Sequence, residues 1–264
     1  MKSLAEKIKN NEPTIGAWIT INHPTIAEIY ANAGFDWVVV DLEHSVITIG
    51  EAENLIRVIE LSGSIPLVRL TSNDSDQIKR VMDAGAHGII VPMIKTKQDV
   101  ENAIKSLKYP PSGERGVGLA RAQHWGNKFN EYLKWLENDS IIIVQIEHID
   151  AVNNLDEIFS LNGISGYIIG PYDLSSSMGV PGDFTNPEFI QTIERIKSKA
   201  KKYNLCGGIH VVEPNTNELQ QRIDEGYGFI AYSLDTRMLD SASRNALSII
   251  KPSLLSVIKS EATP

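Results

Sequence analysis

Short apolar runs recur along this chain, and stretches with apolar residues at every third or fourth position lie between them. The clearest runs are WVVVD at 37–41, GIIVP at 88–92 and SIIIVQIEH at 140–148. Runs that are apolar on both faces are typical of parallel strands covered by helices, and the periodic stretches predict those helices. We expect eight strands, at residues 14–21, 37–41, 65–70, 88–92, 140–148, 163–170, 205–212 and 228–234. We expect the main helices at residues 24–33, 48–61, 74–84, 96–107, 151–159, 187–203, 215–225 and 236–249.

Eight strand–helix units in 264 residues predict a closed (β/α)8 barrel, with residues 1–264 forming a single domain. The glycine-rich fingerprint of dinucleotide-binding folds does not follow the first strand, which argues against an open, doubly wound sheet. Residues 108–127 form a long loop rich in glycine and arginine, and loops of that length are more often functional than idle. Apolar positions in 251–264 predict a last helix that packs on a neighbouring subunit or on its own barrel.

Composition narrows the classes of function. The formal net charge is −8 and the pI is about 5.3, which argues against nucleic acid or an acidic membrane surface as a partner. Cys206 is the only cysteine, so an internal disulfide is excluded and a reducing cytoplasm is the expected location. The first residues lack the apolar core of a signal peptide, and no apolar run approaches the length that spans a bilayer.

Two carboxylates are expected at neighbouring strand ends, where (β/α)8 barrels place their active sites. Glu147 ends the apolar run 140–148, and Asp173 follows the strand at 163–170. Two converging carboxylates either share a proton or hold a hard divalent cation, for which Mg²⁺, Mn²⁺ or Co²⁺ would be suitable. The alternative is that Glu147 forms a structural ion pair with Arg69 or Arg121.

Two further strand ends carry candidate catalytic groups. His44 follows Asp41 by three residues, a spacing that would let the carboxylate orient the imidazole as a general base. A histidine bonded to a backbone carbonyl in a strand-to-helix turn is an equal alternative. Arg69 is a lone charge in IPLVRL, suited to bind a carboxylate or a developing oxyanion, or else to pair internally with Glu43 or Glu147.

Two other histidines are weaker candidates for catalysis. His148 follows Glu147 directly and therefore points to the opposite side of the strand, so we expect it in a loop or behind the site. His210 either lines the mouth of the barrel or serves packing. No lysine occupies a strand end, and Lys95 and Lys97 are the nearest candidates for a Schiff base.

Six segments together resemble one known family. GFDWVVVDLEHS, PLVRL, GIIVPMI, YPPSGERGVGLARA, VQIE and IGPYDLSSSMG are similar, in order and spacing, to the HpcH/HpaI family of metal-dependent class II pyruvate aldolases. The similarity extends over about residues 16–239. The resemblance implies a barrel of the phosphoenolpyruvate/pyruvate type that cleaves a 4-hydroxy-2-oxo acid to pyruvate and an aldehyde, as 2,4-dihydroxyhept-2-ene-1,7-dioate and 2-keto-3-deoxy-sugar-acid aldolases do.

The resemblance also implies roles for single residues. Glu147 and Asp173 match the metal-binding carboxylates of the family. His44 matches its catalytic base, with Asp41 behind it, and Arg69 matches the arginine that stabilises the pyruvate enolate.

Substrate contacts and assembly follow from the same resemblance. Gln145 matches a substrate-contacting glutamine, and the loop of Gly170 and Tyr172 matches the one that receives the pyruvate carboxylate. The chain departs from the common family pattern at Leu70, Tyr172 and His148, which puts the aldehyde specificity in question rather than the chemistry. Members exchange a C-terminal helix, expected here within residues 236–264, and the chain is expected to form a homo-oligomer, a trimer or a hexamer.

Two other functions remain open on the sequence alone. A citryl/malyl-CoA lyase-like carbon–carbon lyase would bind its anionic substrate through Arg115 and Arg121 of the long loop. A non-catalytic metabolite-binding barrel would keep the cavity without turnover.

Overall fold

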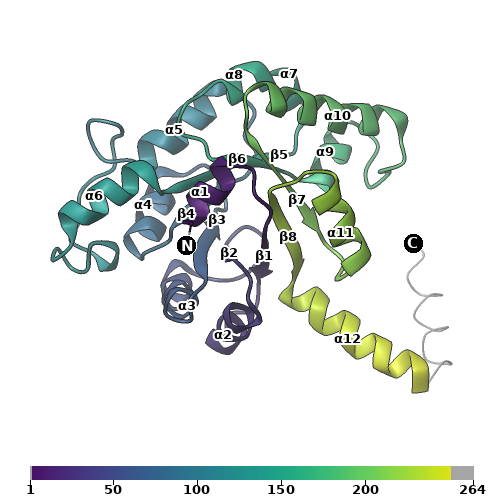
Figure 1. Ribbon diagram of the computed structural model, residues 1–264, viewed down its shortest axis with the longest axis horizontal. Helices are drawn as coiled ribbons and strands as arrows, with labels where there is room; N and C mark the ends of the chain where they lie inside the picture. Colours follow the sequence, from purple (N-terminus) through teal and green to yellow (C-terminus); the bar gives the residue numbers. More distant parts are fainter. Residues whose placement is uncertain (1, 251–264) are drawn as a thin grey trace.

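Eight parallel strands close into a barrel whose strand order follows the sequence, in a computed structural model that describes residues 2–250 (Figure 1). The predicted (β/α)8 fold is therefore confirmed, while the expected helix in 251–264 lies outside the described residues. The strands are β1 Thr14–Ile19, β2 Trp37–Asp41, β3 Ile65–Arg69, β4 Gly88–Val91, β5 Ile141–Ile146, β6 Gly166–Ile169, β7 Cys206–Val211 and β8 Phe229–Leu234. The α-helices are α1 Leu4–Lys9, α2 Pro24–Ala33, α3 Ile49–Leu61, α4 Ser75–Asp83, α5 Lys97–Leu107, α6 Phe129–Asn138, α7 Ile149–Asn153, α8 Leu155–Phe159, α9 Pro171–Ser177, α10 Pro187–Lys202, α11 Thr216–Asp224 and α12 Asp235–Ile250.

Three local features differ from the expectation. The helix expected at 151–159 is two short helices, α7 and α8. The polar segment after β6 contains the short helix α9, and the long loop at 108–127 contains the 3-10 turn Arg121–Gln123. Pro171 at the first position of α9 explains its start, because a proline there has no intrahelical hydrogen bond to lose.

Helix starts follow from capping residues in the sequence. Thr48 accepts a hydrogen bond from the backbone of Glu51, whose carboxylate accepts one from the Thr48 backbone. Thr96 and Asp99 form the same capping box at the start of α5. Each box satisfies two backbone donors that a helix start leaves free.

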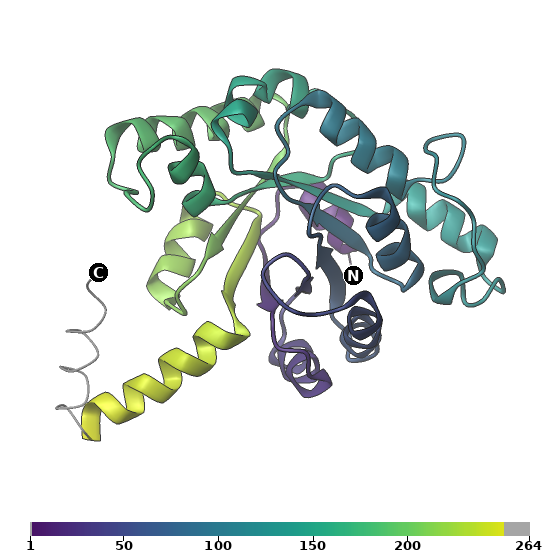
Figure 2. The same ribbon diagram turned by 180° about the vertical axis from the view of Figure 1, so that it is seen from behind.

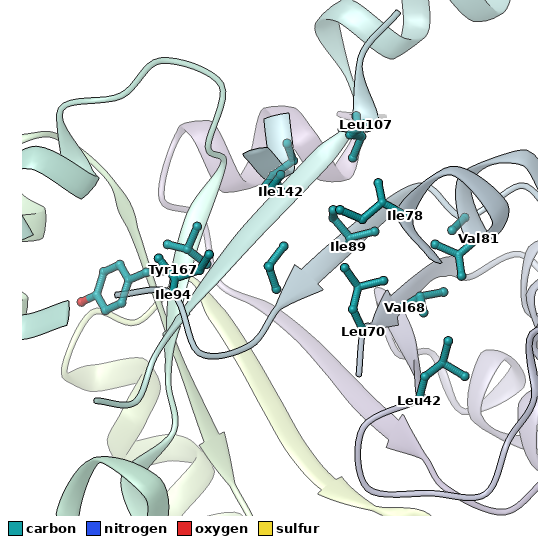
Figure 3. Close-up of a cluster of buried hydrophobic side chains, with 14 of the residues drawn as sticks. Leu42, Val68, Leu70, Ile78, Val81, Ile89, Ile94, Leu107, Ile142 and Tyr167 are labelled. Atoms are coloured by element: carbon teal, nitrogen blue, oxygen red, sulfur yellow. The ribbon is translucent and has the colours of Figure 1, made fainter. Parts of the chain in front are cut away.

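The core has two layers, which explains why the strands are apolar on both faces. Trp37 and Val39 point into the barrel, where Trp37 stacks on Phe229 with ring centroids 4.0 Å apart. Val38 and Val40 point outward to the covering helices. Figure 3 shows this outer layer, with side chains of β3, β4 and β5 against α4 and α5. The inner layer leaves no room for a side chain at Gly16, whose Cβ would lie 2.1 Å from the Trp37 ring.

The last described helix, α12, runs outward from the end of β8 instead of lying flat along the barrel (Figures 1 and 2). Its side chains Leu239, Leu247 and Ile249 are 62%, 52% and 80% exposed. Among residues 2–250, no helix is both long enough and apolar enough to cross a membrane.

Candidate active site

A cavity of about 250 Å³ opens where the carboxyl ends of the strands converge. Larger hollows lie elsewhere, among them one of about 590 Å³ beside His87 and Trp125, which the polar strand-end residues do not line, and one of about 480 Å³ that borders the cavity at Tyr172 and His210. The predicted site residues are brought together around the small cavity, with Glu147 bonded to one of its walls, Gln145. Its walls include Trp18, Thr20, Asp41, His44, Arg69, Gln145, Gly170, Tyr172, Asp173, His210, Val212 and Leu234.

Asp41 and Arg69 form a buried, two-pronged ion pair. Register pairs their backbones at the ends of β2 and β3, so their side chains leave neighbouring strands side by side. Arg69 Nε donates to Asp41 Oδ1 at 2.8 Å, and Nη2 donates to Oδ2 at 2.6 Å. Burial lowers the pKa of Arg69, but the hydrogen bonds and charge of Asp41 outweigh it, so that the pKa lies above its ordinary value. Arg69 is therefore a fixed, permanently charged group at the cavity.

The imidazole of His44 lies beside Glu43 rather than beside Asp41. The His44 side chain is 64% exposed, and its Nε2 is 3.7 Å from Glu43 Oε2. The Asp41 side chain contacts the segment after β2 only through the backbone of that segment: its Oδ1 accepts hydrogen bonds from the amides of Glu43 and His44 at 3.0 and 3.4 Å. The expectation that Asp41 orients the imidazole is thus wrong for this arrangement, because Arg69 and the backbone amides occupy its oxygens.

Glu43 belongs to the site, although the sequence did not indicate that it is a functional residue. Its Oε2 is buried and forms an ion pair with Arg69 Nη1 at 3.1 Å, which was one of the alternatives expected for Arg69. The two atoms lack the geometry of a hydrogen bond. Burial raises the pKa of Glu43, Arg69 lowers it, and the charges of Asp41 and Asp173 raise it further. The signal in the sequence was its position two residues after Asp41, which repeats the side-chain direction along an extended chain.

Glu147 is buried at the end of β5 and held by two donors. Its Oε1 accepts from the backbone amide of Met93 at 2.6 Å, and its Oε2 accepts from the side-chain amide of Gln145. Burial raises the pKa of Glu147 to about 7 against these hydrogen bonds, with the charges of Glu43 and Asp173 adding to the rise. An ion pair with Arg69 or Arg121 is not formed within residues 2–250, so the structural alternative for this acid does not hold.

The backbone near Glu147 is shaped to admit its carboxylate. Met93 adopts φ 53°, an uncommon conformation for a residue with a side chain, and this turn presents its amide to Glu147. Gly170 lies against the same carboxylate, because a Cβ there would be 2.6 Å from Glu147 Oε2 and 3.2 Å from Gln145 Nε2. Asp173 follows within the first turn of α9.

The arginines of the long loop do not face this cavity. The Arg115 side chain is buried, with Nη2 2.5 Å from Asp83 Oδ1 and Nη1 donating to the Tyr132 hydroxyl at 2.9 Å. Arg121 pairs with Glu60 and donates to the Ala84 carbonyl at 3.1 Å, at the amino-terminal end of the barrel. The lyase alternative that used both arginines to bind a CoA substrate therefore loses its basis.

Other candidates are explained by local structure. His148 caps α7, where its Nδ1 accepts from the Asp150 backbone at 3.1 Å. Lys97 lies 3.6 Å from Glu101 on the surface, and neither it nor Lys95 lines the cavity. Cys206 is buried at the start of β7.

The closed barrel, with acids and an arginine gathered at the carboxyl ends of its strands, defines a (β/α)8-barrel enzyme. Residues 14–242 match the model of the HpcH/HpaI aldolase/citrate lyase family, and the chain belongs to that family of carbon–carbon lyases. A 2-keto-3-deoxy-L-rhamnonate aldolase of Escherichia coli (strain K12) is 33% identical over 248 residues, or 93% of this chain and 92% of the relative. The expected aldolase family is confirmed.

Solved structures agree with this assignment. An HpcH/HpaI aldolase/citrate lyase family protein of Burkholderia cenocepacia J2315 superposes with a TM-score of 0.88 at 29% identity, over 94% of this chain and 98% of that one. An HpcH/HpaI aldolase of Desulfitobacterium hafniense DCB-2 gives a TM-score of 0.87 at 27% identity, over 95% and 97% of the two chains.

Proposed function

We propose that this chain reversibly cleaves a 4-hydroxy-2-oxo carboxylic acid to pyruvate and an aldehyde, with a divalent cation held at the strand ends. The observation that carries the proposal is that the charges of Glu43, Glu147 and Asp173 act on one another beside a cavity whose arginine is already paired with Asp41 and Glu43. Such a site carries more negative than positive charge, which favours a bound cation that can act as an electrophile. Membership of an aldolase family whose enzymes are in general metal-dependent supports the same reaction class and a small oxo acid as substrate.

The residues present fit a hard divalent cation. Glu147 and Asp173 would hold it, and the charge of Glu43 acts on both of them. Glu43 is itself paired with Arg69. Among residues 2–250, no three histidine, cysteine or acidic side chains are grouped to hold a metal alone, so substrate oxygens and water would complete the coordination. Two carboxylates with neutral oxygens suit Mg²⁺, Mn²⁺ or Co²⁺. When bound, such a cation supplies Lewis acidity to the keto oxygen of the substrate.

The side chains of the chain itself would position the substrate and move its protons. His44, exposed at the mouth of the cavity, removes the proton of the C4 hydroxyl directly or through water. The C3–C4 bond then breaks, its electron pair forms the enolate of pyruvate, and the aldehyde leaves. Arg69, fixed by Asp41, stabilises the negative charge on the enolate oxygen. The proton that left the C4 hydroxyl, returned by His44 directly or through water, protonates C3 and completes pyruvate.

Two elements of the cavity would contact the oxo acid. Gln145 points to Glu147 from the same strand, and its amide lies within reach of a substrate oxygen bound beside that acid. The turn from Gly170 through Tyr172 to Asp173 brings the amino-terminal end of α9 to the cavity, where the free backbone amides would receive the substrate carboxylate.

The first test is pyruvate release from a 4-hydroxy-2-oxo acid, followed by coupled oxidation of NADH. We expect turnover by the protein loaded with Mg²⁺, Mn²⁺ or Co²⁺, at least 100-fold less after exhaustive EDTA treatment, and recovery when the cation is returned, because the acidic site needs the positive charge. Activity that survives EDTA, or a covalent adduct trapped by borohydride with pyruvate, would contradict the metal-dependent route.

A matched pair of variants tests cation binding independently of catalysis, through the melting temperature of the protein. Glu147→Gln keeps the shape of the side chain but removes its charge, so the rise in melting temperature on adding Mn²⁺ should disappear. Glu101→Gln alters a surface acid paired with Lys97 and should leave that rise intact.

We further propose that α12 is exchanged with a second copy of the chain in a homo-oligomer, a trimer or a hexamer. The helix runs away from its own barrel, and its exposed leucines, Leu239 and Leu247, are of the kind that subunit interfaces cover (Figures 1 and 2).

Introducing charge on α12 should break the assembly. The double substitution Leu239→Glu and Leu247→Glu is expected to convert the oligomer to monomers in light scattering coupled to size exclusion, because each glutamate would have to be buried unpaired. Leu61→Glu changes a leucine of similar exposure, 78%, on α3, and should keep the wild-type mass. A monomeric wild type, or a double variant of unchanged mass, would contradict the exchange.

A further inference from the structure

His210 is a histidine in the cavity that the mechanism above does not use. It lies on β7, and its ring stacks on Trp18 with centroids 4.9 Å apart and planes 25° from parallel. Its Nε2 is 3.2 Å from the backbone oxygen of Ser233 on β8. The ring is therefore held in one orientation by an aromatic face and a hydrogen bond.

This hydrogen bond decides which ring nitrogen carries the proton. A carbonyl oxygen only accepts, so Nε2 must donate to Ser233, and in the neutral ring Nδ1 is then an acceptor. Burial lowers the pKa of His210 to about 4, against the bond to Ser233, and the positive charge of Arg69 lowers it further. At neutral pH the imidazole is uncharged and Nδ1 offers a lone pair.

In the described part of the chain, the Nδ1 lone pair is left without a partner on a residue that lines the cavity. Within residues 2–250, no group forms a hydrogen bond with Nδ1. The buried polar atoms without a partner do not include Nδ1, so this atom keeps some contact with solvent. The apolar part of the cavity wall is formed by Trp18, Val212 and Leu234. The charges of Arg69 and Asp41, which are paired with each other, also act on His210. An unpaired neutral acceptor on a residue of the cavity wall is complementary to a neutral donor, and a hydroxyl group is the donor that hydroxylated oxo acids and aldehydes carry.

We propose that His210 is a substrate-binding residue that accepts a hydrogen bond from a substrate hydroxyl and so favours hydroxylated substrates over their deoxy analogues. This rests on the proposed aldolase function. The hydroxyl belongs either to the oxo acid, at C3, or to the aldehyde, at C2. Both sources share the same chemistry, and the experiment distinguishes them.

The test compares two matched pairs in the direction of carbon–carbon bond formation. One pair is pyruvate and hydroxypyruvate, each with propanal; the other is propanal and 2-hydroxypropanal, each with pyruvate. We expect the wild type to favour the hydroxylated member of one pair by about tenfold in kcat/KM, the value of one neutral hydrogen bond. The pair that shows the preference identifies the end of the substrate that meets His210.

His210→Leu removes the acceptor at similar volume and should abolish that preference, chiefly through a higher KM for the hydroxylated member. His210→Asn keeps an acceptor near the position of Nδ1 and should restore part of it. His87→Leu, at the opposite end of the barrel, serves as the control and should leave the ratio as in the wild type.

Two results would overturn the assignment. One is a wild type without preference in either pair; the other is a His210→Leu variant that loses activity equally with both members, as a purely packing role would predict. The failure of the aldolase function itself would look different, because the wild type would then form no product from any of these pairs, and the role of His210 would fall with it.

Discussion

Arg69→Lys is expected to lower kcat for pyruvate release by about 100- to 1,000-fold, the usual effect of removing one preorganised donor from a developing oxyanion. Lysine keeps the positive charge but lacks the planar guanidinium group with its several N–H donors. A single ammonium cannot reproduce the parallel bonds from Nε and Nη2 to Asp41 while a third nitrogen reaches Glu43. The loss should therefore fall on kcat more than on KM, as measured with the coupled pyruvate assay.

Arg69→Lys should also destabilise the protein, because the buried oxygens of Asp41 lose a donor. We expect the free energy of unfolding to fall by about 1–3 kcal/mol. Arg121→Lys is the matched control, since Arg121 also pairs with an acid, Glu60, but at the other end of the barrel. It should keep the wild-type kcat. Equal losses in the two variants would mean that Arg69 acts only through folding.

The barrel and the position of its site could be predicted because both depend on local patterns. Apolar runs such as WVVVD can be buried on both faces, and a polar residue directly after such a run must lie at a strand end. That reasoning placed Asp41, Arg69 and Glu147 at one end of the barrel, where the structure has them. The pairing of Arg69 with Glu43 was also among the alternatives.

The partners of Asp41 and Glu147 could not be predicted, because they depend on register and on turns. Asp41 bonds to Arg69 instead of the His44 ring because β2 and β3 align these two positions, and sequence spacing along one strand does not contain that alignment. The Met93 amide reaches Glu147 through a turn with positive φ, a conformation that no pattern of apolar residues indicates.

The arginines of the long loop were misplaced for a related reason. Their type suggested anion binding, but the path of a loop is decided by tertiary contacts. Arg115 is drawn into a buried pair with Asp83, and Arg121 reaches Glu60 at the amino-terminal end of the barrel. A charged residue in a loop therefore indicates a need for a partner and not the identity of that partner.

Gly170→Ala should impair the site through a single methyl group. The backbone of Gly170, at φ −96°, is acceptable to alanine, so the effect is steric. The new Cβ would lie 2.6 Å from Glu147 Oε2 and 2.9 Å from its Cβ, and the latter cannot be relieved by rotating the end of the side chain. The carboxylate must move, and we expect about a 100-fold loss of kcat/KM with a weaker rise in melting temperature on adding Mn²⁺.

Gly50→Ala is the matched control for this substitution. Gly50 lies in the first turn of α3, and a Cβ there meets no neighbouring atom within 4 Å, so alanine should keep full activity without lowering the free energy of unfolding. If Gly170→Ala instead bound Mn²⁺ and released pyruvate like the wild type, the position of Glu147 would not be critical, and its proposed role in holding the cation would have to be abandoned. Loss of both properties with the fold intact would tie cation binding and turnover to the same carboxylate.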